Sequence, residues 1–83
     1  MKSITTKYHG PSATKGSRIS ATDNDGNHLM ISKDLSMSVD DGHVKAARTL
    51  CARMGWHGEL VMGWIKPGQH VFVFTKYATK ITV

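Results

Sequence analysis

The clearest pattern along the chain is a helical one between Ser38 and Trp56. Apolar residues recur there at the three- and four-residue spacing of a helix with one buried face. Ser38 suits the N-cap, where its hydroxyl accepts a bond from an unpaired backbone N–H, and Gly55 suits the left-handed residue that ends a helix. The spacing predicts a buried face made of Val44, Ala47, Leu50, Cys51 and Met54.

Alternation of apolar and polar residues predicts strands on both sides of this helix. Three strands are expected before it and two after it, at residues 3–9, 18–22, 28–33, 59–65 and 70–76. Turn-forming residues at 23–27 and 66–69 predict hairpins, which connect antiparallel strands. Residues 78–83 are expected to add a short edge strand or to form a tail.

This order, βββ-α-ββ, predicts an α+β fold in a single domain spanning residues 1–83. We expect one antiparallel sheet of about five strands with the helix packed across one face. The segment 59–65 is apolar on both faces and is therefore predicted to be a central strand. One short helix does not cover Trp64, Phe72 and Phe74 together, so the sheet is expected to curl or to meet a second copy in a homodimer.

Size and cysteine content limit the class of protein. The chain has 83 residues and one cysteine, Cys51, so an intramolecular disulfide is impossible. This composition fits a reducing compartment. The N-terminus lacks the apolar run of a signal peptide, and no stretch has the length of a membrane span. No membrane association is therefore expected.

The net charge of +5 is unevenly distributed along the chain. Basic residues occur without acids before Asp23 and after Ile65, whereas most acids lie between them. If the two terminal parts lie side by side in the sheet, they form a basic surface suited to nucleic acid or an acidic protein. The alternative is an ordinary solvated surface. The predicted partner contacts are Lys7, Lys15, Arg18, Lys66 and Lys76, with Arg48 and Arg53 from the helix.

Motifs for catalysis or metal binding are weak. The five histidines are scattered without paired ligand spacing, and residues 23–26 depart from the spacing of a calcium loop. The glycine-containing loop at 7–18 lacks the P-loop ending, so it is either a phosphate cradle of another kind or an exposed hairpin loop. No nucleophile motif marks a catalytic triad. We therefore expect no enzyme activity, no cofactor and no metal.

Two segments carry a resemblance to a known group. The sequence Thr6-Lys7-Tyr8-His9-Gly10-Pro11, followed by Lys15-Gly16-Ser17-Arg18-Ile19, resembles small uncharacterised proteins of prophages, temperate phages and plasmids. His43, Ala46 and Ala47 on the helix and Gly55-Trp56 after it extend the likeness over most of the chain. The resemblance implies a compact accessory protein of a mobile element in the cytoplasm of a bacterial host. It implies no functional residues.

Together these observations predict a non-enzymatic accessory protein, similar to anti-CRISPR proteins, that inhibits a host defence complex through its basic surface. The expected partner is a host protein or ribonucleoprotein such as a CRISPR effector. One alternative is a nucleic-acid-binding protein without sequence preference. A second alternative is a small enzyme of unknown chemistry.

Overall fold

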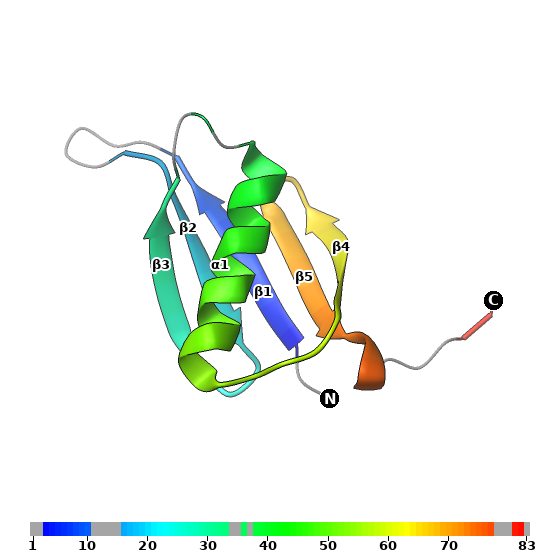
Figure 1. Cartoon of the computed structure of the whole chain (residues 1–83). Coiled ribbons are helices and arrows are strands. Elements are labelled where there is room, and N and C mark those ends of the chain that lie inside the picture. Colours follow the sequence, from blue (N-terminus) through cyan, green and yellow to red (C-terminus); the bar gives the residue numbers. More distant parts are fainter. Residues whose placement is uncertain (1–2, 11–15, 34–35, 37, 78–80, 83) are drawn as a thin grey trace.

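The structure is a computed structural model that describes residues 3–10, 16–33, 36, 38–77 and 81–82. One antiparallel sheet of five strands carries a single helix across one face, which confirms the predicted α+β fold and element order (Figure 1). The elements are β1 (Ser3–His9), β2 (Arg18–Asp23), β3 (His28–Ser32), α1 (Val39–Met54), β4 (Leu60–Lys66), β5 (Gln69–Phe74) and a short 3₁₀ helix, η1 (Thr75–Tyr77).

The strand order across the sheet is β3-β2-β1-β5-β4. The first and last strands are therefore neighbours, with Ile4 opposite Phe72 and Thr6 opposite His70. Consecutive strands pair through hairpins on either side of this central contact, β1 with β2 and β4 with β5. The centre of the sheet therefore joins two strands that lie far apart in the sequence.

The position of β4 corrects one prediction. Its two apolar faces indicated a central strand, but β4 lies at the edge of the sheet, next to β5 only. The reason is that β5 is apolar on both faces as well, and β5 rather than β4 pairs with β1. Val61 and Ile65 of β4 are consequently half exposed, each at 51%.

The helix begins and ends where the sequence predicts. Ser38 Oγ accepts a hydrogen bond of 3.1 Å from the backbone N–H of Asp41, which makes Ser38 the N-cap. Gly55 adopts φ 73°, a left-handed conformation that a residue with a side chain rarely adopts, and closes the last turn. Both ends are fixed by short-range contacts within the helix sequence.

The buried face of α1 is rotated from the predicted one. Ala47, Leu50 and Cys51 are buried as expected, but Met54 is 37% exposed and Val44 is only partly buried. His43 and Ala46, both fully buried, complete the face that meets the sheet. The core joins this helix face to one face of the sheet, through Ile4, Ile19, Ala21, Leu29, Phe72 and Phe74.

Figure 1 shows that α1 crosses in front of β1 and β2, while β4 lies to one side of it. The helix accordingly packs mainly against β1, β2 and β3, and it reaches β5 through Asp40 and His43, which contact His70. The small side chains Ala46 and Ala47 permit this close approach. This offset leaves the helix-facing side of β4 without a second layer over it.

Candidate functional site

Lys7 and Arg18 lie close together on the open face of the sheet, the face opposite α1. Arg18 is directly opposite His9 in the β1–β2 ladder, and Lys7 is opposite Ser20. His9 Nε2 and Ser20 Oγ share a hydrogen bond of 3.0 Å, and Arg18 Nη1 donates to Met30 Sδ. Burial, followed by the positive charges of Lys7, Arg18 and His28, lowers the pKa of His9. The open face of β1–β3 is therefore a small cationic cluster.

Lys66 ends β4 opposite Gln69, whose other neighbour is Lys7, so Lys66 lies on the open face two strands from Lys7. Arg48 and Arg53 are exposed on α1, in the layer on the other side of the sheet. Lys76 lies in η1 beyond β5. Lys15 and the predicted edge strand at 78–83 fall wholly or mostly outside the described residues. The structure thus brings Lys7 and Arg18 together and separates them from the two helix arginines.

Two histidines that sequence reasoning left without a role meet in the core. Thr6 and His70 are neighbours across β1 and β5, and His43 of α1 lies over them. The His43 and His70 rings stack with centroids 4.0 Å apart. Thr6 Oγ1 and His43 Nδ1 share a hydrogen bond of 2.6 Å, and His70 Nε2 donates to the Asp40 carboxylate at 3.1 Å. These contacts hold the first turns of the helix against the centre of the sheet.

The electrostatics of this histidine pair oppose protonation of His43. Burial, and then the neighbouring charge of His70, lower the pKa of His43 to about 4, although Asp40 acts in the other direction. His43 is therefore neutral at pH 7. Its Nε2 and the Nδ1 of His70 are buried without a hydrogen-bond partner among the described residues. Because both rings are almost fully buried, a substrate does not reach these nitrogens, and we assign the pair to packing.

A groove follows the side of α1 that faces β4. One hollow lies between Val44, Ala47 and Arg48 of the helix and Leu60 and Met62 of β4, over Phe72. A second hollow continues toward the helix C-terminus. It shares Arg48, Gly58 and Leu60 with the first, and its remaining lining is Cys51, Ala52, Trp56, His57 and Phe74. We call these two hollows the α1–β4 groove. It is apolar except at Arg48 and His57.

The end of the groove depends on a glycine. Gly58 has φ 139°, and a Cβ added there would lie 3.2 Å from Phe74 Cδ1. The absence of a side chain at this position lets the link between α1 and β4 pass close to the phenyl ring. The aromatic wall is completed by Trp56, whose ring meets Phe74 edge to face at a centroid distance of 6.4 Å.

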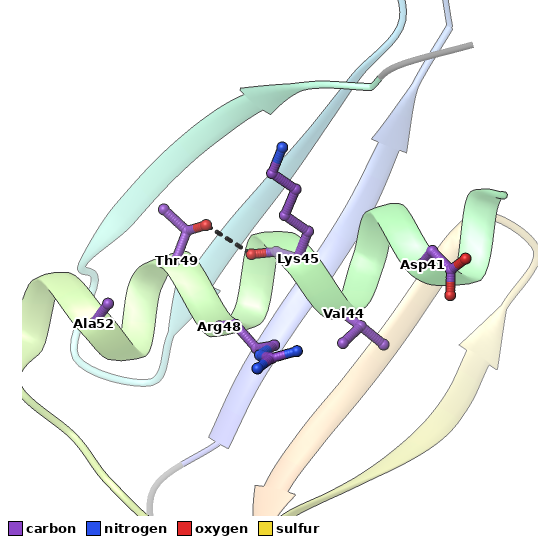
Figure 2. Close-up of a pocket in the computed structure, with 6 residues that line it drawn as sticks. All are labelled: Asp41, Val44, Lys45, Arg48, Thr49 and Ala52. Carbon is purple, nitrogen blue, oxygen red and sulfur yellow. Dashed lines mark hydrogen bonds between the residues drawn. The ribbon is translucent and has the colours of Figure 1, made fainter. Parts of the chain in front are cut away.

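Arg48 also borders a shallow hollow on the outer surface of α1. Figure 2 shows that Arg48 and Val44 point to one side of the helix, whereas Lys45 and Thr49 point to the other. The Thr49 hydroxyl is satisfied locally, since it donates to the carbonyl of Lys45 at 2.7 Å. Arg48 therefore stands on the rim between the helix surface and the groove, where it can reach a bound molecule.

Among the described residues, β4 carries more exposed large apolar side chains than any other element. Trp64 is 67% exposed, Val61 and Ile65 are each 51% exposed, and Met62 is 41% exposed. One side of the Trp64 ring covers His70 at a centroid distance of 4.7 Å. Isolated exposed apolar residues are common on proteins, but a continuous group on one strand indicates an interaction surface.

Comparisons with known proteins add no assignment: no protein family, curated protein or solved structure matches the chain. Within the described ranges, no three His, Cys, Asp or Glu side chains are grouped so that they could hold a metal ion. The same ranges contain no helix with the length and apolar character needed to cross a membrane.

Proposed function

We propose that this protein acts by binding another protein in the α1–β4 groove, without catalysis. The observation that carries the proposal is the groove itself, an apolar channel between the helix and β4 with one exposed cation, Arg48, on its rim. Grooves beside a helix accept an apolar segment of a partner protein, and buried apolar and arginine contacts contribute most of the affinity at such surfaces.

The chemistry of the groove defines the partner segment. Its floor and walls, including Leu60, Phe72 and Trp56, favour apolar side chains. Arg48 favours a carboxylate at the edge of that segment, because a guanidinium pairs with carboxylates in a two-pronged geometry. The partner is therefore a protein with an apolar segment flanked by acidic residues. A host defence complex, as expected from the resemblance to proteins of mobile elements, remains the proposed source of that segment.

Affinity capture tests this proposal. The tagged protein is incubated with a lysate of a bacterium that carries a CRISPR effector, with and without nuclease, and the retained proteins are identified. We expect nuclease-resistant retention of a defence protein. We expect Arg48→Glu to weaken it at least about tenfold, because an interface arginine commonly contributes more than about 1.4 kcal/mol.

Lys7→Glu provides the matched control. It makes the same change of charge on an exposed residue, but on the open face of the sheet. Retention that survives Arg48→Glu and disappears with Lys7→Glu would refute the groove as the binding site.

The cationic cluster on the open face favours one alternative function, binding of nucleic acid. Lys7, Arg18, His9 and His28 lie on adjacent strands there, and phosphate groups would be their natural ligands. In that case the retained material would be bulk nucleic acid. It would be lost as salt rises, because phosphate contacts release counterions. It would also be lost with Lys7→Glu and not with Arg48→Glu.

A further inference from the structure

The edge of β4 offers unpaired backbone groups beside its exposed apolar side chains. Thr75 N donates to the carbonyl of Glu59 at 2.9 Å, so the backbone of Glu59 faces β5. Backbone groups alternate sides along a strand, and those of Leu60, Met62 and Trp64 therefore point away from β5. Among the described residues, no other strand pairs with that side. This edge can accept one more strand.

Proteins usually protect an exposed strand edge with charges, prolines or a covering loop. β4 has no charged residue or proline from Leu60 to Ile65, and its bulge falls only at the end, between Trp64 and Lys66. The other edge strand, β3, is different. Its exposed residues are His28, Met30 and Ser32, of which only Met30 is apolar. The two edges of the sheet are therefore unequal, and β4 has the features of an interface.

The sequence of β4 is symmetric in character about Gly63. Met62 and Trp64 flank it, and Val61 and Ile65 come next, so the symmetric stretch covers residues 61–65. A second copy that runs antiparallel and is centred on Gly63 places Met62 opposite Trp64 and Val61 opposite Ile65. The same register places Lys66 opposite Leu60 of the second copy. Such self-complementarity is the property of an interface with two-fold symmetry.

We propose that the protein forms a homodimer by antiparallel pairing of β4 with β4 of a second copy, centred on Gly63. The outward backbone groups of Met62 then bond those of Trp64 in the second copy, and each exposed apolar residue of β4 meets an apolar neighbour. The dimer is a continuous sheet of ten strands.

The dimer edge adjoins the α1–β4 groove, since Met62 lines the groove and also pairs with Trp64 of the second copy. The two-fold axis is perpendicular to the joined sheet, so both helices lie on the same side of it. The two grooves and their Arg48 residues therefore open on one face, and a partner with two suitable segments binds both at once. The dimer proposal does not depend on the groove proposal, because dimerisation is measured on the purified protein without any partner.

Sedimentation velocity of the full chain over a wide range of protein concentration tests the dimer. We expect a monomer–dimer equilibrium for the unmodified protein. Val61→Lys should raise the dissociation constant by at least about tenfold, since it places two lysines in an apolar seam. Met30→Lys is the matched control, an exposed apolar residue on the other edge strand, and it should leave the dissociation constant unchanged.

Circular dichroism verifies that each variant is folded. A folded protein that sediments as a monomer at every concentration overturns the proposal. A dimer that dissociates with Met30→Lys and survives Val61→Lys overturns it as well.

Discussion

Mild acidification should destabilise this protein through one buried histidine. Burial beside His70 lowers the pKa of His43 from 6.5 to about 4, so the folded protein holds His43 neutral while the unfolded chain protonates it below pH 6.5. Between these two values the unfolded state binds more protons than the folded state. The contribution of neutral His43 to the free energy of unfolding is fully present above pH 6.5. It falls as the pH decreases and is lost near pH 4.

The magnitude follows from proton linkage. With those two pKa values, the free energy of unfolding at pH 5 is about 2 kcal/mol lower than at pH 7.5. For a domain of this size, that loss corresponds to a decrease of roughly 8–16 °C in the melting temperature. The interval ends at pH 5, where most carboxylates are still ionised, so their titration contributes little to the difference.

Urea denaturation at pH 7.5, 6.5, 5.5 and 5.0, followed by tryptophan fluorescence, measures this loss. The variant that isolates it is the double substitution Thr6→Val and His43→Leu. It removes both members of the 2.6 Å hydrogen bond and leaves neither side chain unpaired. We expect its free energy of unfolding to change by less than half as much as that of the unmodified protein.

A second histidine requires a control. The pKa of His9 is also lowered, by burial and by nearby cations, so its titration acts in the same direction. His9→Gln should retain most of the pH dependence, because His9 is only half-buried whereas His43 is fully buried. If the double variant loses as much stability between pH 7.5 and 5 as the unmodified protein does, His43 is not the responsible group and the reasoning is wrong.

Two further predictions concern the turns. Asp23→Ala should lower the free energy of unfolding by about 1–3 kcal/mol. The reason is that the Asp23 carboxylate accepts hydrogen bonds from Asp25 N at 2.9 Å, Asn27 N at 2.7 Å and Asn27 Nδ2 at 2.7 Å. Asp25→Ala, at an exposed position, is the control and should have little effect. Gly55→Ala should lower the same quantity, measured by urea denaturation, by about 1–2 kcal/mol, because φ is 73° there. Gly10→Ala, where φ is not positive and a Cβ meets nothing within 4 Å, is its control, and an equal loss in both variants would contradict the explanation.

The sequence determined the features that depend on neighbouring residues. Ser38 and Gly55 set the ends of the helix through bonds within one turn of themselves. The carboxylate of Asp23 fixes the hairpin between β2 and β3 in the same way, because it accepts hydrogen bonds from backbone N–H groups of the turn. Period-two alternation correctly identified five strands. These features follow from local geometry, which the sequence contains in full.

Strand order was decided by the tertiary structure. The apolar pattern of β4 is the same whether the strand is central or at an edge, because periodicity records which faces are apolar and not what covers them. Pairing of β5 with β1 left Trp64 and Val61 at the surface. The same pairing brought His70 beside Thr6 and under His43, residues far apart in the sequence with no shared motif.

The tertiary structure also separated residues that the sequence grouped by charge. Lys7 and Arg48 contribute equally to the net charge, but they lie on opposite sides of the sheet. Charge counted along a chain does not specify a surface, because alternate residues of a strand face opposite ways and a helix occupies its own layer. The α1–β4 groove likewise arises only from the offset of the helix toward β2, which depends on packing between distant parts of the chain.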